Sequence, residues 1–280
     1  MKKWNLIIDV AKCTSCNNCF LTNRDEHVDN DFPGYAAPQP RHGHRWIDIR
    51  RQERGRSPMV DVAYLPTLCN HCDDAPCVKA STDGAVYKRD DGIVIIDPQR
   101  ALGKKGIVDS CPYHAIWWNE ERGLAQKWIF DAHLLDQGWK QPRGAQACPT
   151  GAFRSLKTED AEMEALAKSD GLEVLHPEYG AKPRVYYKNL YRYTKCFIGG
   201  SVAVDRNGTL DCLAGAQVVL LRAGASIAEE KTDAYGDFKF DRLEKGSRAY
   251  AIEIRHPDHS KKTVEVQLGE SQYVGTMTLT

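Results

Sequence analysis

The chain has 280 residues with 38 basic and 38 acidic side chains, so its formal net charge at pH 7 is zero. A chain without net charge has no electrostatic footprint for nucleic acid or for an anionic membrane, and neither partner is expected. The length exceeds one typical domain of about 100–200 residues and therefore predicts two domains.

The N-terminal segment MKKWNLIIDVAKC predicts a β-strand rather than a membrane span or an export signal. Asn5 and Asp9 interrupt its apolar run, which is far shorter than the about 20 apolar residues of a spanning helix. It also lacks a twin-arginine motif and a small-residue cleavage site. We therefore expect a cytoplasmic protein, in which ten cysteines are better explained as metal ligands than as disulfides.

Eight of the ten cysteines lie between residues 13 and 148 and form two triplets and two Cys-Pro pairs. The triplets are C-x2-C-x2-C over residues 13–19 and C-x2-C-x4-C over residues 69–77, and the pairs begin at Cys111 and Cys148. In ferredoxin-type folds the cysteine before proline ligates a cluster other than that of its own run. Each triplet is thus expected to take its fourth ligand from a distant Cys-Pro.

Outside the cysteine motifs, the sequence predicts few long helices or strands. The run GIVIID over residues 92–97 predicts a short strand between the cysteine motifs. Residues 158–170 predict a helix, because acidic residues open it, Lys168 lies near its end and Gly171 can terminate it. We expect this helix to close the first domain.

From residue 196 onward short apolar runs alternate with Gly, Asn and Asp turns at intervals of about 8–12 residues. The pattern predicts a small antiparallel, Ig-like β-sandwich or barrel. The predicted fold class is therefore α+β. A ferredoxin-like domain with loop insertions and a connector is expected over residues 1–195, followed by an all-β domain over 196–280.

The motifs CTSCNNC, CNHCDDAPC, CPYHAIWW and CPTGA, in this order, resemble the iron–sulfur subunits of molybdopterin enzymes of the dimethyl sulfoxide reductase type. The surrounding segments PGY, GHRW, AHLLD and KPRVYYKNLYR are similar to the small subunits of pyrogallol–phloroglucinol transhydroxylases. Related anaerobic phenol hydroxylases, such as resorcinol hydroxylases, would share them. The resemblance covers almost the whole chain.

The family plan implied by this resemblance has four runs of four cysteines that bind four [4Fe–4S] clusters. Carried onto this chain, it implies two complete ligand sets. The first cluster set is Cys13, Cys16, Cys19 and Cys148. The second cluster set is Cys69, Cys72, Cys77 and Cys111.

The other two clusters of the plan find no cysteine here. One would need Asn23, Trp128, Asp131 and Gly144, and the other Ser81, Ala101, Lys104 and Ile107. Random erosion would have left a mixture of cysteines and other residues. We infer that two clusters were removed as units and that two [4Fe–4S] clusters remain.

Several residues have simpler alternatives. Zinc could occupy either set, but zinc sites usually pair two C-x2-C doublets, whereas these are triplets completed by Cys-Pro. Cys196 and Cys212 are expected to be buried free thiols, with a disulfide as the alternative. His42 and His44 have metal-like spacing but no further ligand nearby, so a loop without metal is favoured.

The charged stretch 41–56 is either a solvated face or a partner contact. Three aromatic residues after Cys111, namely Tyr113, Trp117 and Trp118, are expected in the core, where they would also shield a cluster. Asp131 and His133 are interpreted as structural replacements rather than as a catalytic pair, because no nucleophile or metal motif accompanies them.

The sequence contains no dinucleotide fingerprint, P-loop or Ser/His/Asp arrangement. It predicts a subunit without catalytic residues of its own that transfers electrons through its clusters. By resemblance, a large partner would carry molybdenum as bis-molybdopterin guanine dinucleotide and hydroxylate phenolic aromatics or transfer hydroxyl groups between them. A heterodimer, or a higher oligomer of heterodimers, is expected. The alternatives are a stand-alone two-cluster carrier or the small subunit of another molybdopterin oxidoreductase.

Overall fold

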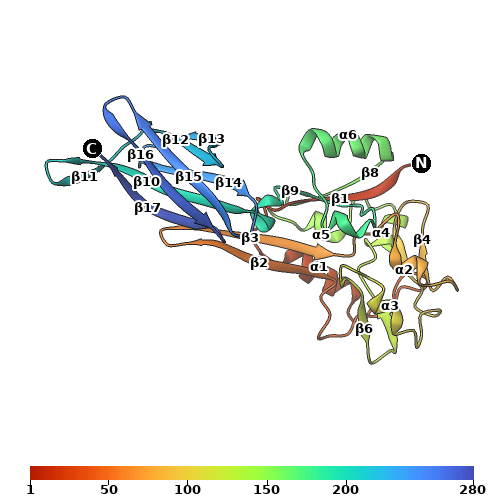
Figure 1. Ribbon diagram of the computed structural model, residues 1–280. Coiled ribbons are helices and arrows are strands. Elements are labelled where there is room, and N and C mark those ends of the chain that lie inside the picture. The colour runs from red at the N-terminus through yellow and green to blue at the C-terminus, as the bar shows by residue number, and fades with distance from the viewer. The chain divides into compact units, whose positions relative to one another are not determined.

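The computed structural model describes all 280 residues, which form two compact units (Figure 1). The first unit contains residues 1–50 and 64–190, and the second contains residues 51–63 and 191–280. None of the helices is long and apolar enough to cross a membrane.

The first unit consists of short elements joined by long loops. In chain order they are β1 (Lys3–Asp9), α1 (Asn18–His27), the start of β2 (Ile47–Arg56), the end of β3 (Met59–Leu68), α2 (Pro76–Lys79), β4 (Val86–Lys88), β5 (Val94–Ile96), α3 (Gly106–Asp109), β6 (Trp117–Asn119), β7 (Leu124–Gln126), α4 (Ala132–Asp136), α5 (Arg143–Gln146), β8 (Phe153–Thr158), α6 (Asp160–Asp170), a 3-10 helix (Pro177–Tyr179) and β9 (Val185–Lys188).

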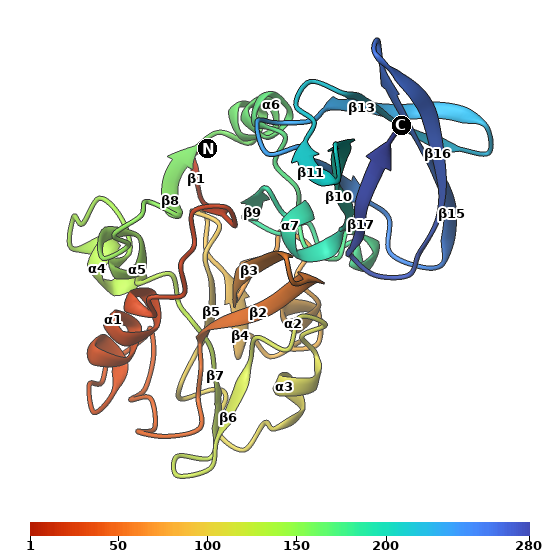
Figure 2. The same cartoon turned by 90° about the vertical axis from the view of Figure 1, so that its left-hand side faces the viewer.

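The predicted N-terminal strand is β1, which is the central strand of a three-stranded sheet with β8 and β9 (Figure 2). It pairs antiparallel with β8 and parallel with β9. Leu6 and Ile8 of β1 are fully buried, which explains the apolar run at the start of the chain. The sheet therefore ties the N-terminus to segments that follow the last Cys-Pro pair.

The predicted helix is α6. It begins with a capping box in which the side chain of Glu159 accepts from the backbone of Glu162 and the side chain of Glu162 accepts from the backbone of Glu159. It ends at Gly171, whose φ of 61° is left-handed. Glycine adopts this conformation without steric cost, which is why the helix stops there.

Two hairpins, β4–β5 and β6–β7, build the apolar support of the cysteine loops. The predicted strand in GIVIID is β5, and its Val94 and Ile96 belong to one buried cluster with Val86 of β4. Cys72 and Cys77 belong to the same cluster, so the hairpin packs directly against two of the proposed ligands.

The second unit contains α7 (Tyr191–Thr194) and eight strands. These are β10 (Cys196–Arg206), β11 (Thr209–Cys212), β12 (Gln217–Arg222), β13 (Ala225–Lys231), β14 (Asp237–Leu243), β15 (Arg248–His256), β16 (His259–Leu268) and β17 (Gln272–Leu279). They form two four-stranded sheets, one of β11, β10, β14 and β17 and one in the order β13-β12-β15-β16.

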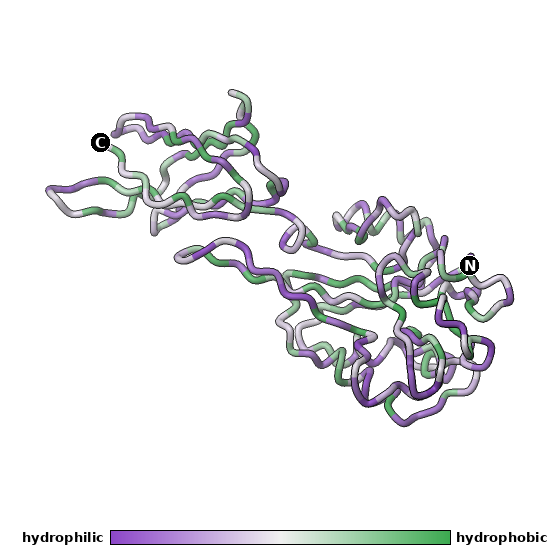
Figure 3. The backbone as a smooth tube through the Cα atoms, turned by 60° about the horizontal axis from the view of Figure 1, so that its bottom comes forward, coloured by the Kyte–Doolittle hydropathy of each residue, from purple (hydrophilic) through white to green (hydrophobic).

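One hydrophobic core is shared by the two sheets of the second unit. Ile198 and Phe240 contribute to it from one sheet, and Val218, Ile252 and Val266 from the other. Along the chain, short hydrophobic stretches alternate with hydrophilic turns (Figure 3). The expectation of a purely antiparallel arrangement is wrong at one place, because β17 runs parallel to β10.

Residues 51–63, the outer part of the β2–β3 hairpin, belong to the second unit, although the predicted domain boundary assigned them to the first. Gly55 explains this membership, because a Cβ atom there would lie 2.5 Å from Cζ of Phe197. Met59 of the hairpin is packed equally closely against Gly199. Side-chain packing, which spacing in the sequence does not reveal, thus recruits the hairpin.

Candidate metal centre

The four cysteines of the second cluster set line a single cavity of the first unit. Cys69 follows β3, Cys72 lies on the next loop, Cys77 lies in α2 and Cys111 follows α3. The first three are 7–8% exposed, and none of the four is in a disulfide. The fold therefore gathers the four residues that the family resemblance assigned to one cluster.

Backbone hydrogen bonds and a left-handed residue shape the loop that carries Cys72. The backbone N–H groups of Asp73 and Asp74 donate to the carbonyl oxygens of Lys182 (2.8 Å) and Ala181 (3.0 Å). His71 has a left-handed φ of 47°, which turns the chain between the first two cysteines. These contacts fix the curled loop without regular secondary structure.

Burial dominates the acid–base behaviour of the second cluster set. It raises the pKa of the Cys77 thiol to about 11, and it raises the pKa of Cys72 further. The neighbouring cysteines add to both shifts, because one thiolate disfavours another nearby. Four buried thiols of this kind become thiolates together only when a cationic centre compensates their charge, which is what metal ligation supplies.

The arrangement of the four cysteines also bears on which group they would hold. A zinc ion holds its sulfurs about 2.3 Å from one point and leaves no space between them. The four cysteines instead surround a cavity that is closed by Ile116, Val94 and Tyr113. In this chain no three His, Cys, Asp or Glu side chains lie close enough together to hold a single metal ion. A cuboidal iron–sulfur cluster, ligated at its corners, fits the second cluster set.

The first cluster set is also brought together. Cys13 and Cys16 lie on the loop before α1, Cys19 lies in α1, and Cys148 follows α5. Cys13 and Cys148 interact electrostatically with each other and with Cys19, so the four thiols form one group. Cys19 is buried, whereas Cys16 is exposed, so this group reaches the surface of the unit.

The two ends of this group have different electrostatic environments. Burial raises the pKa of Cys19 to about 12. Burial also raises the pKa of Cys148, but backbone N–H groups of Phe153, Ala152 and Thr150 outweigh it, so that this pKa is lowered overall. Cys148 therefore forms a thiolate more readily than Cys13 or Cys19.

Polar side chains fill the site of one of the two missing clusters, whose ligand positions are Asn23, Trp128, Asp131 and Gly144. Asn23 lies one helical turn after Cys19 and is 2% exposed. A Cβ atom on Gly144 would lie 3.5 Å from Cβ of Cys19, which brings this position beside α1 as well. Asp131 accepts a hydrogen bond from the backbone N–H of Arg143 at 2.7 Å, and its other oxygen lies 3.6 Å from Nε2 of His27.

The neighbouring His133 lies 2.9 Å, through Nε2, from the carboxylate of Glu26, which also pairs with Arg143. Glu26 thus joins α1 to the segments around α4 and α5. Asp131 bonds to the backbone of Arg143 and His133 to Glu26, which agrees with a structural interpretation of both residues. Trp128, the fourth residue of this set, stacks on Phe130 with 4.8 Å between the ring centroids.

The second vacant position is filled differently. Ala101 and Ile107 belong to the hydrophobic cluster that contains Cys72 and Cys77. Ser81 accepts a hydrogen bond from the backbone N–H of Val86 at 3.0 Å. Lys104 is partly exposed and pairs with Asp83. Apolar packing and local turns occupy this position.

Sequence reasoning missed three residues around the second cluster set: Lys127, His71 and Lys88. Lys127 and His71 line the cavity and are almost completely buried. Nζ of Lys88 donates to the carbonyl oxygens of His71 and Cys72, each at 2.9 Å. Spacing rules single out ligands, and none of these three carries a motif that would have identified it.

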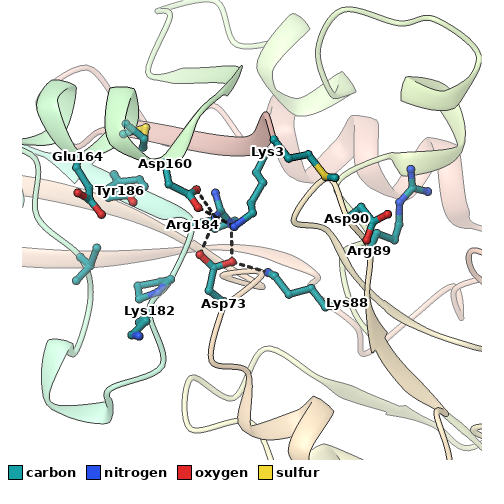
Figure 4. Close-up of a pocket in the computed structure, with 14 residues that line it drawn as sticks. Lys3, Asp73, Lys88, Arg89, Asp90, Asp160, Glu164, Lys182, Arg184 and Tyr186 are labelled. Carbon is teal, nitrogen blue, oxygen red and sulfur yellow. Dashed lines mark hydrogen bonds and ion pairs between the residues drawn. The ribbon is translucent and has the colours of Figure 1, made fainter.

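A charged pocket adjoins the same loop (Figure 4). Arg184 is its centre and pairs with Asp73 and Asp160, each at 2.6 Å. Lys88 reaches Asp73 at 3.0 Å and Lys3 reaches Asp160 at 2.7 Å. These five charges pair with one another, and through Asp73 they support the loop of Cys72.

The remaining candidates lie as follows. His44 donates from Nε2 to the carbonyl oxygen of Trp118 at 2.9 Å, while His42 is exposed. Tyr113 lines the cavity of the second cluster set, and Trp117 is partly buried. Cys196 and Cys212 are both free. Only Cys196 is buried, so the expectation of a buried thiol is wrong for Cys212, which lies at the edge of the sheet on β11.

Comparison with known proteins agrees with this geometry. Residues 60–157 match the family described as the 4Fe-4S dicluster domain. The pyrogallol hydroxytransferase small subunit of Pelobacter acidigallici is 49% identical over 257 residues, which are 91% of this chain and 91% of that protein. The chain belongs to the family of iron–sulfur subunits that includes this small subunit.

More distant relatives include subunits of other reductases. A tetrathionate reductase subunit of Salmonella typhimurium is 31% identical over 67% of this chain and 73% of its own length. The arsenate respiratory reductase iron–sulfur subunit of a Shewanella species is 29% identical over 65% of this chain and 94% of its own length. The resemblance drawn from the cysteine motifs is confirmed, and the chain is an iron–sulfur subunit with [4Fe–4S] clusters.

Proposed function

We propose that this chain is the electron-transfer subunit of a heterodimeric molybdenum enzyme that acts on phenolic aromatics. The observation that carries the proposal is the gathering of eight cysteines into two separate groups of four in the first unit. The 49% identity to a pyrogallol hydroxytransferase small subunit supports the substrate class.

The chain's own residues hold the clusters and set their environment. Each cluster set would supply four thiolates to one [4Fe–4S] cluster, which takes up and releases single electrons. Around the second cluster set, the buried residues Ile116 and Val94 exclude water. Around the first, N–H groups of Phe153, Ala152 and Thr150 stabilise the charge on Cys148.

The partner supplies the ring chemistry in this proposal. A large subunit with molybdenum bound as bis-molybdopterin guanine dinucleotide would hydroxylate the ring with oxygen from water or transfer a hydroxyl group between rings. Hydroxylation from water releases two electrons, which need an acceptor beyond the ring, and the two clusters provide the way out. Hydroxyl transfer is redox-neutral overall and needs no long chain of clusters.

We also propose the domain architecture, the location and the assembly of the protein. The first unit would form the ferredoxin-like domain, and the strands over residues 196–280 an Ig-like β-sandwich, to which two sheets with a shared core give support. A cytoplasmic location is proposed because all ten cysteines are free, as is usual in a reducing compartment. Heterodimers could assemble further into a higher oligomer.

Metal and sulfide analysis of the co-purified complex tests the proposal, together with EPR spectra of the reduced protein. We expect about eight iron atoms and equal acid-labile sulfide in this subunit, as two [4Fe–4S] clusters require. Co-purification with a molybdenum-containing subunit is expected as well. A stable monomer that carries both clusters without such a partner would favour the stand-alone carrier, and about twelve or sixteen iron atoms would refute the two cluster sets.

A further inference from the structure

Lys127 is buried at a place where the chain supplies no acidic partner. Lys127 is 1% exposed and directly follows β7. Lysines are almost never fully buried unless they are paired, because removing an ammonium group from water is costly. A buried lysine therefore calls for a compensating negative charge.

The hydrogen bonds of Lys127 do not provide that charge. Nζ donates to the carbonyl oxygens of Val94 at 2.5 Å and of Trp128 at 3.2 Å. Both acceptors are neutral, and no carboxylate in the chain forms an ion pair with this group. An ammonium group has three donors, so one donor is left over.

Lys127 adjoins the cavity between the four cysteines of the second cluster set. Lys127 lines this cavity together with all four cysteines. It acts electrostatically on Cys77 and Cys111 in the direction that favours their thiolates. Thiolates bound to a four-iron core carry a net negative charge, which grows by one when the cluster is reduced.

We propose that Lys127 is the internal counter-charge of the cluster held by the second cluster set and raises its reduction potential. A fixed positive charge in a medium of low dielectric constant stabilises the more negative, reduced state over the oxidised one. Lys127 is thus a residue that tunes the cluster without binding it. The inference rests on the proposed function, because it requires a cluster at this set.

A comparison with two neighbouring lysines explains why Lys127, and not these two, is expected to raise the reduction potential. Lys88 also lies close to the loop of Cys72, but its ammonium group forms an ion pair with Asp73 at 3.0 Å. Lys104 is partly exposed and is paired with Asp83. Their charges are compensated or screened by water, whereas that of Lys127 is neither.

The test is an EPR-monitored redox titration of both clusters in the co-purified complex with the substitutions Lys127→Met, Lys127→Arg and Lys104→Met. For Lys127→Met we expect the ratio of reduced to oxidised second cluster, at a fixed potential, to fall at least tenfold. This corresponds to 59 mV for a one-electron couple. The first cluster is expected to change less than about twofold, and Lys104→Met is expected to leave both clusters unchanged.

The Arg and Met variants separate charge from packing. Methionine is the closer match to lysine in shape, whereas arginine keeps the charge. We expect Lys127→Arg to retain the second cluster and most of its potential, and Lys127→Met to shift the potential or to lose iron at that site. A Lys127→Met complex with an unshifted second cluster, or one that retains more iron than Lys127→Arg, would overturn the proposal.

The wild-type complex distinguishes this inference from the proposed function. If its iron content or EPR spectrum lacks a cluster at the second cluster set, the proposed function fails and the inference fails with it. If both clusters are present and only the shift is missing, the role of Lys127 alone is refuted.

Discussion

Arg184 and Asp73 form a two-pronged ion pair beside the second cluster set. Nε and Nη2 of the arginine donate to the two carboxylate oxygens at 2.7 and 2.6 Å. The side chain of Arg184 is 4% exposed, and Asp73 directly follows Cys72 in the chain. A residue far along the chain, on the segment leading into β9, thus fixes the loop of a proposed cluster ligand.

Replacing this arginine is expected to loosen the loop of Cys72. Arg184→Met leaves Asp73 with Lys88 alone and removes the donor to the buried amide of Asn5. Breaking a fully buried pair costs about 3–5 kcal/mol, but Asp73 is 31% exposed, so we expect about 2 kcal/mol here. Chemical unfolding of the complex and its iron content measure the effect.

The matched control is the exposed pair of Lys79 and Asp74 on the same loop. Lys79→Met is expected to change the free energy of unfolding by less than about 0.5 kcal/mol, because exposed ion pairs contribute little. Equal effects of the two substitutions would contradict a special role of Arg184.

The crossed ligation of the clusters gives a second prediction. Cys148→Ala is expected to remove the first cluster and about half of the iron, because the triplet over residues 13–19 loses its fourth thiolate. Asn23→Cys is expected to restore no cluster, since the other positions it would need hold Trp128, Asp131 and Gly144. EPR spectra and iron analysis of the reduced complex measure both.

Cys212→Ala is the matched control for this prediction, because Cys212 is a free, exposed thiol outside both cluster sets. It should leave the spectra and the iron content unchanged. If Cys148→Ala kept both EPR signals, the proposed partner of the first triplet would be wrong.

The sequence could predict the elements and gatherings that depend on spacing. The crossed-ligand rule works on cysteine order and predicted a distant Cys-Pro for each triplet, and the family resemblance assigned Cys111 and Cys148 to their triplets. The acidic residues of its first turn and the glycine at its end, Gly171, predicted the extent of α6 from local chemistry alone. Alternation in the C-terminal part likewise indicated strands such as β12 and β15, whose apolar residues face the shared core.

What spacing could not reveal is which side chains meet in the folded chain. The parallel pairing of β10 with β17 is not encoded in either strand's own pattern. Lys127 reads as an ordinary polar residue beside Trp128, and only the fold shows that it lines the cavity of the second cluster set. The charged stretch 41–56 predicts a solvated face or a partner contact, whereas packing assigns its residues from 51 onward to the second unit.

That packing predicts a strong effect of Gly55→Ala. The φ of Gly55 is +78°, and a Cβ atom would lie 2.4 Å from the carbonyl oxygen of Met59 and 2.5 Å from Cζ of Phe197. Both strain and overlap follow, and we expect a loss of about 2–4 kcal/mol in the free energy of unfolding. Hydrogen exchange of β10 peptides measures it within the second unit.

Gly208 offers the matched control, because its φ is +82° and a Cβ atom there would meet nothing within 4 Å. Gly208→Ala should carry only the backbone strain, about 1–2 kcal/mol. If the two substitutions had equal effects, the close contact between the hairpin and Phe197 would be unimportant.

The last prediction concerns acid sensitivity of the second unit. Arg54 pairs there with Asp61 and with Asp241, the latter at 2.8 Å, and its side chain is 2% exposed. Burial raises the pKa of Asp241, but the pairing with Arg54 outweighs it and keeps this pKa below its usual value of 3.8. The same balance, with Arg192 as a further partner, lowers the pKa of Asp61.

A lowered carboxyl pKa in the folded state stabilises the protein above the unfolded pKa, and this contribution is lost as the pH falls through the folded value. We therefore expect Arg54 to protect β14 fully at about pH 6 and progressively less as the pH falls below 3.8, the usual pKa of these carboxyl groups. Hydrogen exchange of wild type and Arg54→Met, compared at each pH, measures the difference. Because iron loss in acid affects both proteins alike, a difference that stayed constant with pH would show that Arg54 contributes through packing on Phe197 instead of through its charge.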